Sequence, residues 1–382
     1  MPDDVTPYRV EIPEADLRDL WERLARTRWP EGETVEDWSQ GLPLAYMREL
    51  CAHWADGYDW RATEARLNAL PQFRTEVDGL GIHFVHVRSR HPEALPLVMT
   101  HGWPGSVVEF LKVIGPLTDP TAHGGAAADA FHVVCPSLPG YAFSDRPAQR
   151  GWNVERIAAA WVRLMARLGY ERYGAQGGDW GSVVCANVAD LDADHVAGLH
   201  LNFVVVRPPE GENAPLTPAE QRRLDAMAAW RRTGAGYQEI QGTKPQTLGY
   251  ALEDSPAGLA AWIVEKFAAW SDCDGDVERS FTKDQLLTNV MAYWVTATAT
   301  SSTRLYYEMR QAGRDAVPTR FIDVPTGIAN YPAEITAMPR RWVEHRYNVV
   351  HWAELPRGGH FAAMEVPDVF VDDVRTFFQP LR

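Results

Sequence analysis

The sequence predicts an α/β protein with a mostly parallel sheet, a helical lid and an N-terminal arm. Two observations carry this prediction. From Leu95 onward, short apolar runs alternate with helical stretches, which is typical of a parallel sheet covered by helices on both faces. Residues 208–302 interrupt that alternation with helical sequence rich in Trp, Tyr and Ala, as expected of a lid inserted between two strands.

The composition indicates a large buried core and an acidic surface. Of the 382 residues, 46% are hydrophobic, and 37 Lys and Arg against 51 Asp and Glu give a net charge of −14. This balance argues against binding to nucleic acid or to an anionic membrane, because both require clustered positive charge. The sequence has no run of 18 apolar residues and begins with acidic residues, so we expect no membrane anchor, no secretory signal and a cytoplasmic protein.

The four cysteines, Cys51, Cys135, Cys185 and Cys273, lie far apart and form no C-x-x-C pair. We expect them to be reduced and to serve as core packing, since a disulfide framework is unusual in a chain of this length.

Residues 1–90 are expected to form the arm and to pack on the core and the lid. Apolar residues recur at helical spacing between Pro13 and Pro30, and further helices are predicted at 44–54 and 60–70. Residues 73–87 alternate apolar with polar side chains, which predicts strands.

The remaining chain divides into a first core segment (91–207), the lid (208–302) and a second core segment (303–382). A helix is predicted at 154–168 and another at 183–189. Strands are predicted at 95–99, 131–135, 172–175, 196–203, 320–324 and 348–352.

The strongest chemical signal is the segment Gln176-Gly177-Gly178-Asp179-Trp180-Gly181-Ser182, placed between a predicted strand and a predicted helix. A nucleophile elbow needs small residues two positions before and two after the nucleophile, because its tight turn brings strand and helix backbones together. Gly177 and Gly181 meet this need, so Asp179 is the candidate nucleophile. The alternative is that Asp179 only caps the helix.

The segment from His101 to Ser106 follows the strand predicted at 95–99, where such a fold keeps its oxyanion-hole loop. The backbone N–H groups of Trp103 and Trp180 are the candidate donors, since Pro104 has no N–H to donate. His101 precedes the nucleophile in the chain, so we expect it to brace the loop rather than act as a base.

The catalytic base is predicted near the C-terminus. His360 follows Gly358 and Gly359, which let a loop carry an imidazole over the elbow. Asp323, Glu344 and Glu354 are alternatives for the acid, but Glu334 is favoured because it lies in a Pro-rich loop past a strand end. The order Asp179, Glu334, His360 matches the nucleophile–acid–histidine order of α/β-hydrolases.

Four motifs together resemble epoxide hydrolases of the α/β-hydrolase fold, most closely the microsomal and juvenile-hormone group. The resemblance runs from about Tyr8 to the end of the chain and implies an α/β-hydrolase fold with that group's N-terminal extension. It also implies that Tyr237 and Tyr306 are the ring-opening acids, with the adjacent Tyr307 as the alternative to Tyr306. The motifs are Gly-Gly-Asp-Trp-Gly-Ser (177–182), His-Gly-Trp-Pro-Gly-Ser (101–106), Pro-Gly-Tyr-Ala-Phe-Ser (139–144) and Gly-Gly-His-Phe-Ala-Ala (358–363).

This resemblance and the aspartate nucleophile predict an epoxide hydrolase that opens an apolar or aryl epoxide to a vicinal diol. The expected intermediate is an aspartyl alkyl-enzyme ester, hydrolysed by water that the histidine activates. We expect Trp103, Trp180 and Phe361 to contact the substrate. Substrate and water are the expected partners, with no metal or cofactor and with a homodimer as an open possibility. The alternatives are a haloalkane dehalogenase, which would not need paired phenols, and a non-catalytic ligand-binding protein on the same scaffold.

Overall fold

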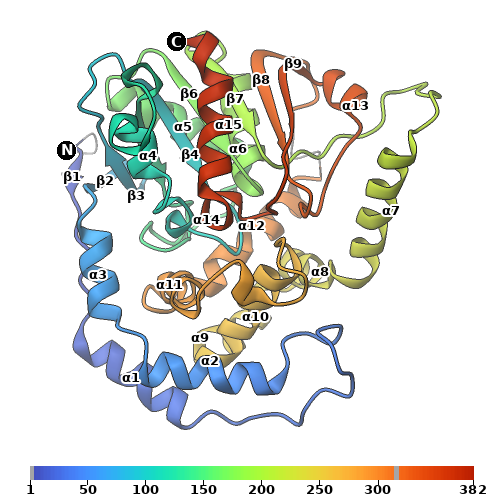
Figure 1. The fold of residues 1–382 in the computed structure, drawn as a ribbon. Helices are drawn as coiled ribbons and strands as arrows, with labels where there is room; N and C mark the ends of the chain where they lie inside the picture. Colours follow the sequence, from blue (N-terminus) through green and yellow to red (C-terminus); the bar gives the residue numbers. More distant parts are fainter. Residues whose placement is uncertain (1–3, 314–317) are drawn as a thin grey trace.

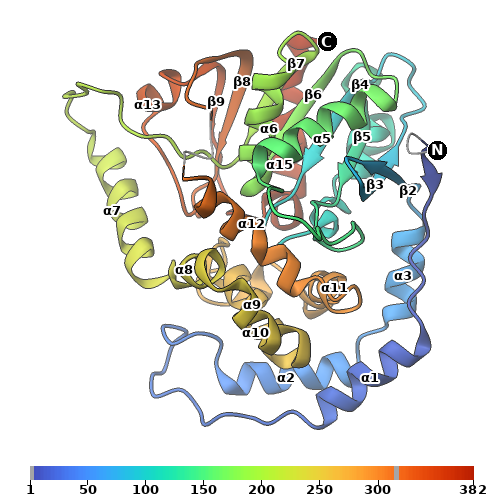
Figure 2. The same ribbon diagram turned by 180° about the vertical axis from the view of Figure 1, so that it is seen from behind.

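A computed structural model describes residues 4–313 and 318–382, and its centre is one twisted sheet (Figures 1 and 2). Within these residues nine strands pair in the order β1-β2-β3-β5-β4-β6-β7-β8-β9. Every pair from β5 to β9 is parallel, whereas β1, β2 and β3 extend one edge with antiparallel pairs. The predicted mostly parallel sheet is therefore confirmed. The strands are β1 (Thr6–Pro7), β2 (Gln72–Val77), β3 (Leu80–Val87), β4 (Leu95–Thr100), β5 (Phe131–Pro136), β6 (Tyr173–Gly177), β7 (Val196–Leu201), β8 (Ile322–Asn330) and β9 (Tyr347–Glu354).

Helices cover both faces of the sheet (Figures 1 and 2). One face carries α5 (Val154–Arg167) and α6 (Trp180–Leu191), and the other carries α4 (Ile114–Thr118), α14 (Ala362–Glu365) and α15 (Pro367–Phe378). In α5, Asn153 caps the first turn, and the buried side chains recur at helical spacing, which turns one apolar stripe toward the sheet. A short helix, α13 (Arg340–Glu344), precedes β9.

Strand β8 is longer than the sequence predicts. The prediction ended it at residue 324 and placed Pro325, Thr326 and Gly327 in a loop, but the strand continues to Asn330 with irregular register beside Pro325. Gly327 is required inside the strand because an added Cβ would lie 2.6 Å from the ring of Phe377 on α15. The loop that carries Glu334 therefore begins only after Asn330.

Among the described residues between β7 and β8, six α-helices form the lid. The predicted boundary after residue 302 falls inside α12, which continues until Gly313 ends it with a φ of +63°. The helical pattern of residues 299–312 is unbroken, so the helix joins the two predicted segments, and the division of the chain into domains stays a prediction. The lid helices are α7 (Pro218–Thr233), α8 (Gly236–Thr243), α9 (Pro245–Asp254), α10 (Pro256–Ala269), α11 (Lys283–Trp294) and α12 (Ala299–Ala312).

The N-terminal arm contains α1 (Glu14–Ala25), α2 (Leu44–Asp56) and α3 (Trp60–Asn68). Its strand β1 pairs with β2 of the sheet, while α1 and α2 lie against the lid (Figure 1). Arg23 of α1 bonds the carboxylate of Asp254 in the lid at 2.8 Å, and His53 of α2 lies 2.6 Å from Asp284. The arm thus contacts both the sheet and the lid.

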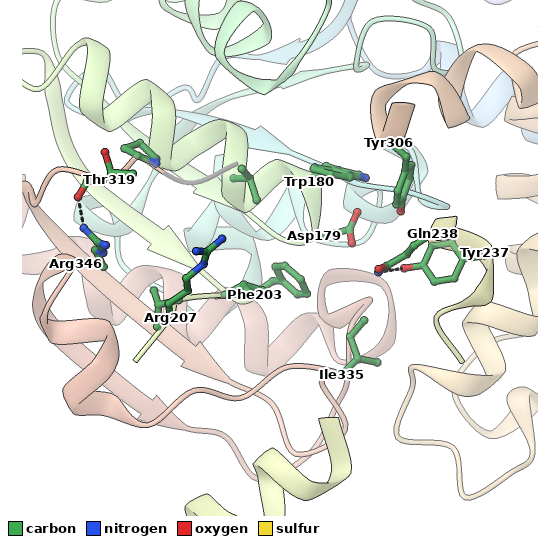
Figure 3. Close-up of a pocket in the computed structure, with 14 residues that line it drawn as sticks. Asp179, Trp180, Phe203, Arg207, Tyr237, Gln238, Tyr306, Thr319, Ile335 and Arg346 are labelled. Carbon is green, nitrogen blue, oxygen red and sulfur yellow. Dashed lines mark hydrogen bonds between the residues drawn. The ribbon is translucent and has the colours of Figure 1, made fainter. Parts of the chain in front are cut away.

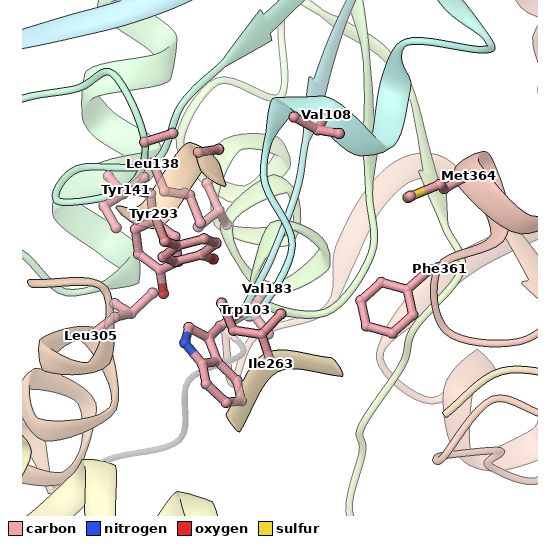
Figure 4. Close-up of a cluster of buried hydrophobic side chains, with 14 of the residues drawn as sticks. Trp103, Val108, Leu138, Tyr141, Val183, Ile263, Tyr293, Leu305, Phe361 and Met364 are labelled. Carbon is pink, nitrogen blue, oxygen red and sulfur yellow. The ribbon is translucent and has the colours of Figure 1, made fainter. Parts of the chain in front are cut away.

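A buried apolar cluster joins the lid to the sheet (Figure 4). Ile263 and Leu305 come from the lid, whereas Trp103 and Val183 come from segments that follow β4 and β6. All four cysteines are free and buried. In residues 4–313 and 318–382, no helix is both long and apolar enough to cross a membrane. Short 3₁₀ helices lie at Val107–Phe110, Pro120–His123, Ala127–Asp129, Val277–Arg279 and Gln379–Leu381.

Candidate active site

Asp179 occupies a strained turn between β6 and α6. Its φ of 48° and ψ of −130° are unfavourable for a residue with a Cβ, and such strain is concentrated at functional sites. The flanking glycines are required by close approach. At Gly177, an added Cβ would lie 2.3 Å from the carbonyl oxygen of Gly181. At Gly181, an added Cβ would lie 1.8 Å from the carbonyl oxygen of Thr100. The turn therefore has the geometry of a nucleophile elbow.

The loop after β4 lies against the Asp179 carboxylate. The backbone N–H of Trp103 donates to Asp179 Oδ1 at 2.8 Å. Gly102 makes this approach possible, because a Cβ there would lie 2.2 Å from the Asp179 carboxylate. His101 braces the loop as expected: its Nδ1 lies 3.0 Å from the carbonyl oxygen of Gly102, and its Nε2 accepts from the N–H of Leu138 at 3.2 Å.

A lid helix holds the same loop in place, which the sequence did not reveal. On α11, Asn289 donates to the carbonyl of Pro104 at 2.8 Å and accepts from the hydroxyl of Ser106 at 2.8 Å. Tyr293, one turn further on, donates to the carbonyl of Gly105 at 2.5 Å. These hydrogen bonds cross the boundary between lid and core, so no local sequence pattern in either segment predicts them.

His360 lies between two carboxylates. Its Nδ1 is 2.8 Å from Glu334 Oε1, and its Nε2 is 3.3 Å from Asp179 Oδ2. Burial by itself lowers the pKa of this imidazole, but the charges of Glu334 and Asp179 outweigh burial and raise the pKa well above its usual value. The free site thus favours a protonated His360. The three predicted residues, far apart in the sequence, form one connected chain.

The loop before His360 depends on its two glycines. Gly358 has a φ of +104°, and a Cβ at Gly359 would lie 2.4 Å from the carbonyl oxygen of Trp270. That same carbonyl accepts the backbone N–H of His360 at 2.8 Å, which fixes the loop against the lid.

Tyr237 of α8 and Tyr306 of α12 face Asp179 from the lid. Their ring centroids are 5.8 Å apart, with Tyr237 stacked on Trp103 at 5.1 Å and Tyr306 edge-on to Trp180 at 4.9 Å. Burial is the main cause that raises the pKa of both phenols, and the charge of Asp179 also raises it, so both are protonated at neutral pH. Tyr306 lines the cavity with Asp179, whereas the neighbouring Tyr307 is not among its lining residues.

Comparisons with known proteins show the family of this chain. A family model described as "Epoxide hydrolase N terminus" matches residues 5–110, and one described as "alpha/beta hydrolase fold" matches residues 96–249. A protein of Stigmatella aurantiaca is 52% identical over 99% of this chain and 86% of its own length. Epoxide hydrolase 1 of Sus scrofa is 38% identical, covering 98% of this chain and 88% of the relative. The chain belongs to the epoxide hydrolase family.

A solved structure confirms the α/β-hydrolase fold of this family member. The juvenile hormone epoxide hydrolase of Bombyx mori superposes with a TM-score of 0.90 at 31% identity, covering 99% of this chain and 95% of the solved one. The resemblance stated from the motifs is thus confirmed, including its juvenile-hormone branch.

The cavity of this epoxide hydrolase has a volume of about 300 Å³ (Figure 3). Asp179, Trp180, Tyr237 and Tyr306 lie at one end, and the walls between the ends are mainly apolar. The opposite end is cationic, as Arg207 and Arg346 line it. The other lining residues are Val183, Phe203, Val205, Val206, Gln238, Pro318, Thr319 and Ile335.

Two of the three predicted substrate contacts lie outside the lining of this cavity. Trp103 and Phe361 instead border a smaller void behind Asp179. Phe361 packs face to face on Phe267 of α10, with ring centroids 3.9 Å apart. Contact of Trp103 and Phe361 with the substrate stays a prediction.

Glu109 is a site residue that sequence reasoning missed. It is half-buried beside the smaller void, which is about 20 Å³ and is also bordered by Asp179 and His360. Burial raises its carboxyl pKa to about 8. The structure makes room for it at Gly105, where a Cβ would lie 1.4 Å from Glu109 Oε1. The available signal was a lone carboxylate in the apolar run Val107–Phe110.

Proposed function

We propose that this epoxide hydrolase opens an apolar or aryl epoxide to a vicinal diol through an ester of Asp179. The observation that carries the proposal is that acidic and basic groups lie on opposite sides of the Asp179 carboxylate. Two protonated phenols face one side of the Asp179 carboxylate, and the Glu334–His360 pair lies against the other. This arrangement provides a nucleophile, acids for the leaving oxygen and a base for water.

In the first step an Asp179 oxygen attacks an epoxide carbon, and the C–O bond of the ring breaks. The leaving oxygen would be a strongly basic alkoxide unless it receives a proton. Tyr237 and Tyr306 lie where they can donate one, and burial keeps both phenols protonated until the oxygen develops charge. The apolar walls favour an apolar body on the substrate.

Forming the ester also prepares His360 for the second step. In the free site, the negative charge of Asp179 helps to keep the imidazole protonated. Esterification removes this charge, so the pKa of His360 falls and the imidazolium releases its proton to solvent. The neutral ring can then accept a proton from water. The base thus becomes competent only after the intermediate has formed.

Water then attacks the ester carbonyl, and the carbonyl oxygen becomes an oxyanion. The N–H of Trp103 already contacts Asp179 Oδ1, and the N–H of Trp180 opens α6 on the other side of the elbow. In other hydrolases, loss of one such donor costs roughly 3–4 kcal/mol of activation free energy. His360 returns the proton to the departing alcohol, which releases the diol.

The test is the intact mass of His360→Gln after incubation with a panel of epoxides. We expect a mass gain of one whole epoxide on the peptide that contains Asp179, because the ester forms and is not hydrolysed. Asp179→Asn in the same background is the matched control and should gain nothing. Normal multiple turnover by His360→Gln would contradict the assignment of the base.

A parallel panel of haloalkanes separates the alternative. A halide leaves without a proton, so a dehalogenase has no use for two protonated phenols. Adducts from haloalkanes alone would replace our proposal with that activity. The homodimer and the cytoplasmic location stay predictions, tested by light scattering and by fractionation of the source cells.

A further inference from the structure

Helix α10 of the lid carries a buried lysine that the mechanism above does not use. Lys266 is 7% exposed, and its Nζ lies 4.9 Å from the ring centroid of Tyr237 and 5.9 Å from that of Trp270. Its ionic partner is the adjacent Glu265, whose side chain is 27% exposed. The ammonium group is thus held against aromatic rings at the cavity end where the leaving oxygen is placed.

Lid stability does not require a charge at this position. The surrounding α10 residues Ile263, Val264 and Phe267 are buried and apolar, so an apolar side chain would suit the same place. Replacing a buried ion pair by apolar groups of similar volume is often neutral or stabilising. Packing therefore does not explain why this position carries a lysine.

The charges that face Tyr237 explain why a lysine is useful here. Asp179 and Glu265 are both anionic, and each opposes loss of the phenolic proton. Gln238 donates a hydrogen bond to the phenol oxygen at 3.0 Å, and the ring of Tyr306 packs against that of Tyr237. Lys266 adds a positive charge on the ring itself, where a desolvated cation interacts most strongly with a π-system.

We propose that Lys266 is a positioning residue for Tyr237, and that its ammonium stabilises the phenolate formed as the epoxide opens. The proposal rests on the proposed function. As the Asp179–carbon bond forms and the ring C–O bond breaks, the phenolic proton passes to the epoxide oxygen. A phenolate remains, with its charge spread over oxygen and ring, and the ammonium lies beside it. The proton released when water restores the Asp179 carboxylate regenerates the phenol.

The experiment compares rates of ester formation in the His360→Gln background, followed by intact mass after rapid mixing with an epoxide. Lys266→Met should slow ester formation by about 10- to 50-fold, a range consistent with a cation over a desolvated ring. Lys266→Arg, which keeps the charge, should recover most of the rate. With His360 restored, the hydrolysis of preformed ester should be unchanged in Lys266→Met.

A double-mutant cycle with Tyr237→Phe separates charge from packing. If Lys266 acts through the phenol, Lys266→Met should cause no further loss once the phenol is gone. An equal loss in both backgrounds, or ester formation at the parent rate in Lys266→Met, would overturn the proposal.

Glu265→Gln provides a second, independent readout. Lys266→Met leaves Glu265 as an anion without its partner, so adding Glu265→Gln should restore part of the lost rate. A purely structural role predicts no such rescue and a lowered melting temperature instead. If the His360→Gln parent forms no ester with any epoxide, the proposed function fails, whatever the Lys266 variants do.

Discussion

Glu109→Gln tests whether the carboxyl beside the catalytic pair is protonated in the folded protein. Burial raises the pKa of Glu109 from 4.5 to about 8, while the charge of His360 lowers it and that of Asp179 raises it. The backbone N–H of Ser106 also bonds this carboxyl and favours the ionised form. Burial prevails, and the folded protein holds a proton that the unfolded chain loses above pH 4.5.

The sign of the stability effect follows from this proton. Between pH 4.5 and 8 the unfolded state binds fewer protons than the folded state, so Glu109 makes the free energy of unfolding fall as pH rises. Gln does not titrate, so the variant gains stability relative to wild type. At about 1.4 kcal/mol per pKa unit, the difference reaches roughly 3 kcal/mol at pH 7 and about 5 kcal/mol above pH 8. Water entering the small void would reduce both values.

Urea unfolding of wild type and Glu109→Gln at pH 5, 6, 7 and 8 measures this difference. We expect near-equal stabilities at pH 5 and a growing advantage for the variant above it. Glu93→Gln, at an exposed glutamate, is the control and should leave the pH dependence unchanged. The assignment of a protonated Glu109 would be refuted by a stability difference that does not change with pH, or by a wild type that becomes more stable than the variant as pH rises.

Three further substitutions, two of them paired with a control substitution, test the site. Tyr306→Phe should slow ester formation at least 100-fold, which is the usual lower limit for the contribution of general acid catalysis. Tyr307→Phe should leave the rate of ester formation unchanged. Rapid-mixing mass spectrometry measures both rates. Asn289→Ala should lower the free energy of unfolding by about 2 kcal/mol and turnover at least 10-fold, because it removes two hydrogen bonds to the oxyanion loop. Melting curves and steady-state rates measure these effects, and full activity would contradict the prediction. Gly181→Ala places a Cβ 1.8 Å from a carbonyl oxygen of β4 and should yield little folded protein, whereas Gly32→Ala, with no atom closer than 4.0 Å, should express normally.

The sequence was most informative where the evidence lies in consecutive residues. Two glycines around Asp179, between a strand and a helix, predict an elbow because no larger residue fits that turn. Two glycines before His360 likewise indicate a loop that can approach another backbone. The Pro-rich loop past a strand end then favoured Glu334 as the acid, and the structure places it 2.8 Å from the imidazole.

What the sequence did not predict depends on segments that meet only in the folded chain. Asn289 lies in a largely buried helix, and nothing near it in sequence indicates that its side chain holds the loop around Pro104. Lys266 resembles a surface lysine until α10 is packed against α8. Strand β8 was cut short because Pro325 and Gly327 are turn-forming residues, although pairing with both neighbouring strands overrides that preference.

These long-range contacts also constrain how the lid works. The oxyanion loop is held by α11, the backbone of His360 by Trp270, and the two phenols stand on α8 and α12. Swinging the whole lid away from the sheet would break the bonds that shape the nucleophile's surroundings. It would also expose the apolar cluster that joins lid and core. Opening of that kind would cost far more than entry through the end of the cavity lined by Arg207 and Arg346. We therefore expect substrate to enter along the cavity, past apolar walls, and to meet Asp179 in a site that is already assembled.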